Sequence, residues 1–417
     1  MKISNKSTWE SFYVPQKFGK LKENTSTDAV IIGGGMVGIL TAYLLAKEGI
    51  SVVILEKDRI LTGATMFTTA FLTQNYDTDI VDSIKIYGKK KTKQIWDSHG
   101  NAIDLIEKII KQEKIECEFM WCSNYSYGNV EEDVDLLKEE YDAMKKVSIS
   151  NVSFTKTNKI LPGKFGLLET KRQAKFNPMK FLLALVPRLE EMGVRIYEKT
   201  EVQKISGTKP VKAHVGQLVA EGTKVITATY DPLNNPKETF AKKGMYVSYV
   251  FEVQIPKGTF PEGIYEDLEN PYHYFRIDKG GKFDRMIIGG EDNRKEIEFR
   301  AQKNFNALED YLTGLMGKSK YQIVRKWRGP ILEPSDGLPL IGEFKSNQLL
   351  AAAFSGNGMT YSAISAMMFR DAILKKKNPW FKLFDPTRTP SAKQLFYKAR
   401  DYGEEFIKGA VRNTFKY

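Results

Sequence analysis

Two short apolar runs flank a glycine-rich segment near the start of the chain. The runs DAVIIG at 28–33 and SVVILE at 51–56 are rich in β-branched residues, which is typical of buried parallel strands. Between them, apolar residues recur at helical spacing from Met36 to Gly49. The pattern therefore predicts a strand–helix–strand unit, preceded by a polar arm over residues 1–27.

Further along the chain the pattern alternates between helical and extended segments. Residues 79–150 have a mostly helical pattern with many charges, and Pro178 begins another helix that ends near Gly193. Strands are predicted at 194–198, 201–205, 224–229, 245–256, 272–277 and 286–288, and a last helix at 359–374.

This order predicts α/β structure combined with antiparallel β structure. A Rossmann-like nucleotide-binding domain is interleaved with a substrate domain built on a mixed or antiparallel sheet. The nucleotide-binding domain is assigned to 1–80, 172–240 and 325–390, the substrate domain to 81–171 and 241–324, and a basic helical tail to 391–417.

Composition excludes several classes of protein. The chain has 417 residues but only two cysteines and three histidines, which excludes a disulfide scaffold, a four-cysteine iron–sulfur site and a cysteine-rich zinc site. A Rieske centre is also excluded, because Cys117 and Cys122 have no histidine nearby. No apolar run has the length of a signal peptide or of a membrane-spanning helix, so we expect a soluble cytoplasmic protein.

Gly33, Gly35 and Gly38 form a G-x-G-x-x-G motif between the first strand and the first helix, and Glu56 ends the next strand 18 residues after Gly38. This is the context of a dinucleotide-binding turn. Gly33 allows the tight turn, Gly35 lets a pyrophosphate approach the backbone, and Gly38 lets helix and strand pack closely. Glu56 can accept hydrogen bonds from the ribose hydroxyls and disfavours a 2′-phosphate, so FAD and NAD remain open.

Several stretches, one of which contains this motif, carry a resemblance to a known family. They are residues 28–58, GATMFTTAFLT at 63–73, NPYHYFRI at 270–277, IIGGED at 287–292, WRGPILEPSDGLPLIG at 327–342, FSGNGMTYSAISA at 354–366 and NPWFKLFDPTR at 378–388. Together they resemble the FAD-dependent oxidoreductases of the D-amino-acid oxidase superfamily, such as glycine oxidase and sarcosine oxidase. Within that superfamily the chain is most similar to the bacterial subgroup that often carries a C-terminal Rieske domain.

The resemblance implies that FAD is the cofactor and that a C–N bond of a small amine or N-substituted amino acid is oxidised by hydride transfer to the flavin. The product would be an imine. The cofactor-binding positions that it implies are Gly33, Gly35, Met36, Gly38, Glu56, Lys57, Thr65, Thr68, Thr69, Val202, Thr229, Gly356, Gly358 and Met359. Gly356 and Gly358 begin a helix whose positive end would face the flavin where negative charge develops on reduction.

The substrate-binding candidates are aromatic or basic residues on or beside the predicted substrate sheet: Tyr249, His273, Tyr274, Arg276 and Trp327. Strand alternation places His273 on one face of its strand and Tyr274 and Arg276 on the other, so only one face can line a pocket. We expect no metal ion and no obligatory catalytic base, because the flavin itself performs the oxidation.

Three departures from the superfamily pattern refine these expectations. Phe67 stands where the subgroup often has a histidine that links flavin covalently, so we expect non-covalent FAD. Ile331 stands four residues after Trp327, where amino-acid oxidases have an arginine for the substrate carboxylate; Arg328 or Arg276 are the substitutes to consider. The sequence ends without a Rieske module, so we expect electrons to pass to oxygen or to a separate acceptor.

Other interpretations remain open. Cys117 and Cys122 have the C-x4-C spacing of a flavin-linked redox disulfide, although two ordinary thiols are the default and no second nucleotide motif for NAD(P)H follows. The protein could instead be a non-catalytic FAD-binding scaffold or a flavin oxidoreductase with a non-amine substrate.

Charge adds two further alternatives. The net charge of +12 allows an RNA-modifying flavoprotein, but no RNA-binding module is recognisable, and we expect a small-molecule substrate and no nucleic acid. The tail at 391–417 is interpreted as a packing helix, with docking to a membrane surface or a partner as the alternative.

Overall fold

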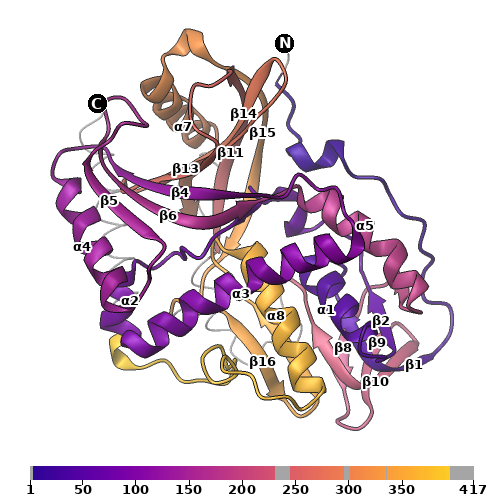
Figure 1. Ribbon diagram of the computed structural model, residues 1–417. Coiled ribbons are helices and arrows are strands. Elements are labelled where there is room, and N and C mark those ends of the chain that lie inside the picture. Colours follow the sequence, from indigo (N-terminus) through magenta and orange to yellow (C-terminus); the bar gives the residue numbers. More distant parts are fainter. Residues whose placement is uncertain (1–2, 231–244, 295–300, 335, 395–417) are drawn as a thin grey trace.

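The computed structural model describes residues 3–230, 245–294, 301–334 and 336–394. The strands of this part of the chain form two sheets, one in the lower part and one in the upper part of Figure 1. The predicted tail helix lies outside the described residues from position 395 onwards.

The first sheet is mostly parallel and carries the glycine-rich turn. Its strands lie in the order β16 (Leu340–Lys345), β17 (Gln348–Ala352), β10 (Leu218–Thr227), β1 (Thr25–Ile32), β2 (Val52–Leu55) and β7 (Arg195–Tyr197), and β9 (Val211–Val215) and β8 (Lys204–Ser206) extend it antiparallel from β10. The β1–β2, β1–β10, β10–β17 and β2–β7 pairs are parallel.

Both faces of this sheet are covered, which explains the continuous apolar runs of its central strands. One face packs against α1 (Met36–Ala46), α3 (Lys89–Glu113), α5 (Pro178–Glu191) and α8 (Gly358–Ile373), which Figure 1 shows gathered around the sheet. The other face buries Val30 and Val53 against Val211 and Ala213 of β9. Helix α1 is buried along almost its whole surface, because it lies between the sheet and its neighbouring helices.

The second sheet is mostly antiparallel. Its order is β15 (Gln322–Leu332), β11 (Met245–Pro256), β14 (Phe283–Arg294), β13 (His273–Asp278), β12 (Gly263–Asp267), β4 (Met120–Gly128), β6 (Phe165–Lys175) and β3 (Phe71–Leu72), with β5 (Val152–Thr157) beside β6 and a parallel β12–β4 pair. One face packs against α7 (Ala301–Met316) through Phe305, Leu308 and Leu312.

Helices α2 (Ile80–Tyr87) and α4 (Asp133–Lys146) pack together at the β4–β6 end of the second sheet. Short 3₁₀ turns occur at η1 (Thr8–Ser11), η2 (Ala64–Phe67) and η4 (Lys318–Lys320).

The structure confirms the predicted fold class. Each sheet is assembled from segments that alternate along the sequence, which is the interleaving expected from the order of the patterns. The exact domain boundaries stay a prediction. The stretch 79–150 contains strand β4 as well as the expected helices. Its alternating aromatic residues Trp121, Tyr125 and Tyr127 carry a strand signal that the charged helices on either side obscured.

The N-terminal segment is packed against the body of the protein. Trp9 is fully buried in the main core, and its indole N–H donates to the carbonyl oxygen of Thr68 at 2.5 Å. The Thr8 hydroxyl donates to Glu252 on β11 at 2.6 Å, and Ser4 pairs with Arg325 on β15. This segment therefore connects the second sheet to the loop that follows the glycine-rich unit.

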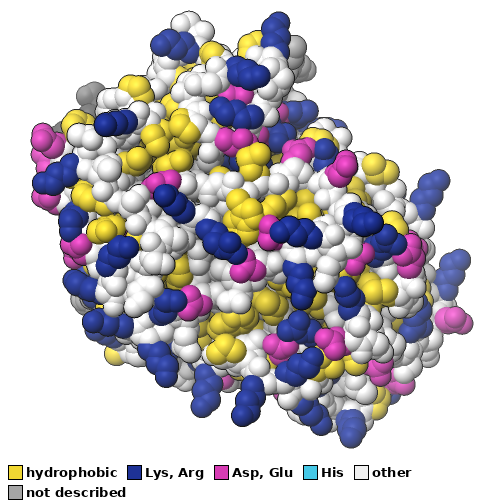
Figure 2. All heavy atoms as spheres, in the orientation of Figure 1, with side chains coloured by type: hydrophobic (Ala, Val, Ile, Leu, Met, Phe, Trp, Pro, Cys, Tyr) yellow, Lys and Arg dark blue, Asp and Glu magenta, His cyan; other side chains and the backbone are white. Residues whose placement is uncertain are grey.

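Surface charge is mixed on the face shown in Figure 2. Lys and Arg side chains are spread over this face with Asp and Glu among them, and they do not form a single basic stripe. Among the described residues, no helix has the length and apolar character required to cross a bilayer.

Replacing Trp9 should test the role of the N-terminal segment. Trp9→Ala removes a fully buried ring and is expected to lower the free energy of unfolding by about 3–5 kcal/mol. Urea denaturation followed by fluorescence measures the change. Val14→Ala, at a position that is 63% exposed, is the matched control and should change stability by less than about 0.5 kcal/mol. Equal effects of the two substitutions would contradict the packing described here.

Candidate active site

One cavity of about 1380 Å³ extends from the glycine-rich turn of the first sheet to the inner face of the second. It exceeds the roughly 300–1,000 Å³ of most small-ligand pockets, so it has room for a dinucleotide together with a small substrate. Residues from the β1–α1 turn, the loop after β2, the start of α8 and strands β11, β13 and β14 line it.

The β1–α1 turn has the close contacts that require glycine. Gly33 has φ +112°, and a Cβ there would lie 2.6 Å from the Ala228 carbonyl oxygen. A Cβ on Gly38 would lie only 2.0 Å from the Gly33 carbonyl oxygen, so this residue sets the distance between helix and strand. A Cβ at Gly35 would point into the narrow gap beside the Thr65 hydroxyl, 3.3 Å away. The turn is therefore a bare backbone cradle at the N-terminus of α1, which suits an anion.

Glu56 follows β2 and lines the cavity beside this turn, together with Lys57. Its carboxylate accepts hydrogen bonds from the Gly34 amide at 2.7 Å and from the Asp58 amide at 2.8 Å. Each carboxylate oxygen has two acceptor sites, so the remaining lone pairs can accept from a ribose. Val202 and Thr229 line the same part of the cavity.

The loop after β2 is held from several directions. Thr65 accepts a hydrogen bond from the Met36 amide at 3.2 Å. Trp327 donates from its indole N–H to the Phe67 carbonyl oxygen at 3.0 Å, as Trp9 does to Thr68. These bonds fix the backbone of a loop whose residues 67–69 line the cavity.

The start of α8 closes the cavity opposite this loop. Gly356, Asn357, Gly358 and Met359 all line it. The Asn357 amide group donates to the Asn75 carbonyl oxygen at 3.1 Å, while its buried Oδ1 accepts from no donor among the described residues. A second helix N-terminus with an unsatisfied polar atom thus faces the same space.

The sequence of residues 28–372 matches the family described as DAO, FAD dependent oxidoreductase. The chain belongs to this family.

Sequence similarity to named relatives covers most of the chain. YhfW of Bacillus subtilis, whose name describes a Rieske 2Fe-2S iron-sulfur protein, is 29% identical over 412 residues, or 97% of this chain and 80% of that protein. Gamma-glutamylputrescine oxidoreductase of Escherichia coli is 22% identical over 385 residues, or 87% of this chain and 86% of that protein.

Solved structures support the same fold. Glycine oxidase from Geobacillus kaustophilus superposes with a TM-score of 0.72 at 18% identity, over 88% of this chain and 100% of that chain. The predicted superfamily and subgroup are thus confirmed. The DAO family is FAD-dependent, and the bare turn, Glu56 and the second helix start together fit a dinucleotide of that kind.

The candidate residues on β13 divide between two faces, as strand alternation requires. Tyr274 lines the cavity, and its phenol shares a hydrogen bond of 2.8 Å with the Ser248 hydroxyl. Its ring fits because Gly289 lies opposite on β14, where a Cβ would be 2.5 Å from the Tyr274 oxygen. Burial raises the pKa of Tyr274 well above its usual range, so this phenol stays protonated.

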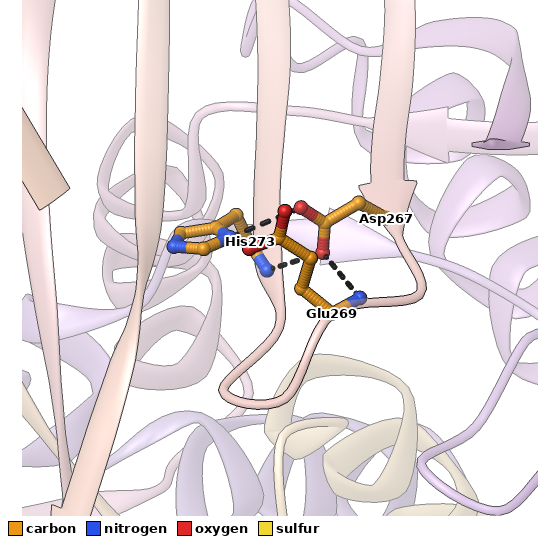
Figure 3. A group of neighbouring side chains, drawn as sticks. All are labelled: Asp267, Glu269 and His273. Carbon is orange, nitrogen blue, oxygen red and sulfur yellow. Dashed lines mark hydrogen bonds and ion pairs between the residues drawn. The ribbon is translucent and has the colours of Figure 1, made fainter. Parts of the chain in front are cut away.

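His273 lies on the other face, away from the cavity, in the cluster of Figure 3. Its Nδ1 is 3.0 Å from Asp267 and its Nε2 is 3.3 Å from Glu291, and its ring stacks on Tyr311. Burial alone would lower the pKa of His273, but the hydrogen bonds to the two carboxylates raise it to about 9.

Ligand atoms of Asp267, Glu269 and His273 lie within 4.8 Å of one another, a spacing that could suit a metal ion. Both ring nitrogens of His273 already face carboxylates, and the raised pKa favours the imidazolium form, which donates to both of them. The cluster is therefore explained as a buried ion-pair group.

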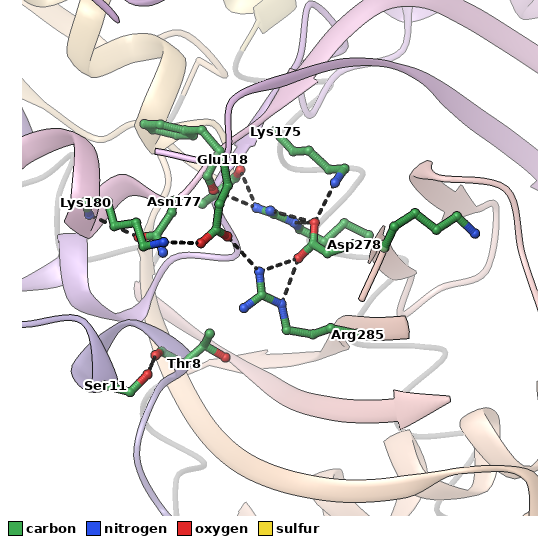
Figure 4. A network of polar contacts seen from close by, with 12 residues as sticks. Thr8, Ser11, Glu118, Lys175, Asn177, Lys180, Asp278 and Arg285 are labelled. Atoms are coloured by element: carbon green, nitrogen blue, oxygen red, sulfur yellow. Dashed lines mark hydrogen bonds and ion pairs between the residues drawn. The ribbon is translucent and has the colours of Figure 1, made fainter. Parts of the chain in front are cut away.

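Arg276 is buried in the core and does not line the cavity. Its neighbours Lys175, Asp278 and Arg285 are shown in Figure 4. Its guanidinium donates to Asp278 at 2.8 Å and to the carbonyl oxygens of Thr69, Ala70 and Phe176. Lys175 and Arg285 contact the same Asp278 carboxylate. Burial alone would raise the pKa of Asp278, but these three cations hold it below its usual range.

The remaining candidates also lie outside the cavity lining. Tyr249 is fully buried against Phe305 of α7, and Trp327 supports Phe67 from behind. Arg328 is exposed and, like Arg276, does not line the cavity, whereas Ile331 does. Neither of these two arginines therefore lies where it could bind a substrate carboxylate in the cavity, as the sequence had suggested.

The two cysteines are both free thiols, Cys117 buried and Cys122 partly buried. Burial raises the pKa of each thiol to about 12, so neither is activated as a thiolate at neutral pH. Neither lines the cavity, which removes the geometric basis for a flavin-linked redox disulfide.

Sequence reasoning missed the polar groups that do face the substrate side: Asp292, Tyr272, Ser248, Glu333 and Asp77. Asp292 belongs to the IIGGED stretch, and the two glycines before it were the available signal, because they leave open space on the neighbouring strand. Which side chain fills the space beside these glycines depends on how the strands are aligned, and the local sequence pattern does not specify that alignment.

Gly38→Ala tests the close approach of α1 to β1. The added Cβ would force the turn apart, which should destabilise the holoprotein by about 1–3 kcal/mol and release FAD. The ratio of flavin to protein absorbance and thermal unfolding measure both effects. In Gly314→Ala, on α7, the added Cβ meets nothing within 4 Å, so this control should keep its FAD and unfold at the same or a higher temperature.

Arg276→Met tests the buried ion network. Removing this cation leaves Asp278 with fewer partners and should cost about 3–5 kcal/mol of stability at pH 7. The pKa of Asp278 is lowered in the folded protein, so the stabilisation is complete above the ordinary aspartate pKa near 4 and disappears as pH falls through the lowered value. Denaturation at several pH values measures the difference.

The matched control for this substitution is Arg172→Met, which breaks an exposed pair with Asp104 and should cost about 1 kcal/mol or less. The difference in the free energy of unfolding between wild type and Arg276→Met should become smaller at acid pH. A difference that stays the same would contradict the assignment of Arg276 as a partner of Asp278.

Proposed function

We propose that the protein uses non-covalently bound FAD to oxidise a C–N bond of a small amine or N-substituted amino acid. The observation that carries the proposal is one continuous cavity that joins the nucleotide-binding turn to the polar face of the second sheet. FAD bound there would supply a two-electron acceptor for the hydride of the C–H bond next to the amine nitrogen, and water would hydrolyse the iminium ion that results. Electrons then pass to oxygen or to a separate acceptor.

The positions proposed for FAD follow the geometry of the cavity. Gly33, Gly35 and Met36 would receive the pyrophosphate at the start of α1, while Gly38 keeps that helix close to β1. The adenosine half would lie along Glu56, Lys57, Val202 and Thr229, and the flavin half along Thr65, Thr68, Thr69, Gly356, Gly358 and Met359.

Non-covalent attachment is supported by the chemistry of the cavity wall. Phe67 lines the cavity at the position where related proteins often have a linking histidine, and its ring has no nucleophilic atom. No histidine or cysteine occurs among the described residues that line the cavity.

An amine fits the substrate side better than a plain amino acid does. Ile331 lines the cavity where an amino-acid oxidase has its carboxylate-binding arginine, and neither Arg276 nor Arg328 replaces it. The name of the Escherichia coli relative, gamma-glutamylputrescine oxidoreductase, also refers to an amine. The size of the cavity speaks against a scaffold that has lost its substrate pocket.

The absorption spectrum of the purified protein is the first test. We expect a yellow protein that releases FAD into the supernatant on denaturation, and whose flavin is bleached anaerobically by at least one member of a panel of amines and N-substituted amino acids. Flavin that remains with the precipitate would contradict non-covalent attachment. A colourless protein that also fails to bind added FAD would contradict the proposed function as a whole.

A further inference from the structure

We propose that the substrate is an amine without an α-carboxylate that enters the cavity as its ammonium ion, and that Asp292 is the counter-ion that receives this group and takes up its proton before the C–N bond is oxidised. This inference rests on the proposed function, because it concerns the substrate side of the same cavity.

Asp292 lies at an irregular point of the β11–β14 pairing, between the Tyr249–Gly290 and Val247–Asn293 pairs. It lies near the end of β14, just beyond Gly289 and Gly290, and lines the cavity with Ser248 of β11. Ser248 is paired with Gly329 of β15, and a Cβ at Gly329 would lie 3.1 Å from the Phe67 carbonyl oxygen. The register therefore brings Asp292 close to the loop proposed to flank the flavin.

Negative charge faces Asp292 from several elements. Glu333 approaches from the segment after β15 and Asp77 from the segment before α2, while the neighbouring hydroxyls belong to Tyr272, whose phenol lies 3.4 Å from Oδ2, and to Ser248. Burial and the charges of Glu333 and Asp77 raise the pKa of Asp292 to about 7. A cation in this space would relieve the repulsion, whereas a substrate carboxylate would add to it.

The basic residues of the cavity do not offset this charge. Among the described residues that line it, the cations are Lys57 and Lys85. Lys57 follows Glu56 on the nucleotide side, and Lys85 forms an ion pair with Asp82 at 2.9 Å.

Two other carboxylates in the cavity, those of Glu140 and Glu266, already have donors. Glu140 accepts from the Ile80 and Val81 amides at 2.7 and 3.0 Å. Glu266 accepts from the Asn124 amide group and the Ser126 hydroxyl, both at 2.7 Å. The Oδ1 atom of Asp292, by contrast, is buried and has no donor among the described residues.

A buried carboxylate oxygen without a donor carries a desolvation cost that protonation or a nearby cation removes. An incoming ammonium group would therefore supply the donor that Asp292 Oδ1 lacks among the described residues.

Aromatic rings complete a surface that suits an ammonium group. The rings of Tyr272 and Tyr274 lie 5.5 Å apart with an interplanar angle of 31°, and Phe71 meets Tyr274 edge-on at 5.7 Å. Burial raises the pKa of both phenols, so they remain neutral rings. Neutral aromatic faces beside a carboxylate attract ammonium ions.

The first experiment measures binding to the holoprotein. The probe is tert-butylammonium, which cannot be oxidised because the carbon attached to its nitrogen has no hydrogen. Perturbation of the flavin absorption spectrum at pH 8 reports its affinity. Asp292→Asn should weaken binding by about 10- to 100-fold, since it removes a hydrogen-bonded charge pair. Asp310→Asn, at an exposed site on α7, is the matched control and should bind as the wild type does.

The pH profile tests the same idea in the unaltered protein. Only the ionised form of Asp292 attracts the probe, so affinity should be constant above pH 7 and fall about tenfold for each unit below it. In Asp292→Asn the profile should be flat. Wild-type affinity that does not change between pH 5 and 8 would overturn the assignment even if the variant fails to fold.

Matched pairs of amines and amino acids separate this inference from the proposed function. Butylamine differs from norvaline, and N-methylbutylamine from N-methylnorvaline, only by the missing α-carboxylate. We expect the amines, and not the amino acids, to bleach the flavin anaerobically. Reduction by the amino acids alone would overturn the inference and leave the proposed function standing. Asp292-dependent probe binding with no reduction by any compound would support Asp292 as the cation-binding residue, but it would overturn the proposed oxidation and with it the identity of the substrate.

Discussion

The buried guanidinium of Arg276 is the contact on which much of the structure depends. It lies on a strand of the second sheet, yet it donates to carbonyl oxygens of Thr69 and Ala70 in the loop after β2 and of Phe176 before α5. Such a cation can be buried only because Asp278 lies beside it and because every carbonyl it meets is fixed. The loop that borders the cavity is consequently attached to both sheets. The Trp9 ring lies over the same guanidinium, with its centroid 5.7 Å from the guanidinium carbon.

On the substrate side of the cavity, glycines on the second sheet leave space for large neighbouring groups. Gly289 allows the Tyr274 ring to lie across the sheet, and Gly329 allows strand β15 to approach the Phe67 backbone. Polar groups then gather where the strands end, and the apolar face behind them packs on α7. The chemistry of the cavity is thus set by side chains on a rigid sheet, while the nucleotide side uses backbone groups at helix starts.

The nucleotide side could be predicted from sequence because its constraints are local. The spacing of Gly33, Gly35 and Gly38, the flanking strand and helix, and the acid at Glu56 all lie within one strand–helix–strand unit. The substrate side could not be predicted in the same way. Strand alternation correctly placed Tyr274 and Arg276 on the same face of β13. Along that face, however, Tyr274 lines the cavity whereas Arg276, two residues later, is buried in a core of ion pairs. Asp292 and Glu333 come close only through the register of separate strands.

The order of strands in the first sheet has a consequence for how the protein is made. Strand β1 pairs with β10, so that Thr25 lies beside Ala220, and β10 pairs with β17, so that Val225 lies beside Gln348. Contacts this distant in sequence form slowly, because the chain loses the entropy of closing a long loop before the strand contacts stabilise the fold. During synthesis the glycine-rich turn emerges early but has no complete sheet beneath it until β17 and α8 have left the ribosome. The ability to retain the flavin nucleotide therefore arises late and nearly all at once.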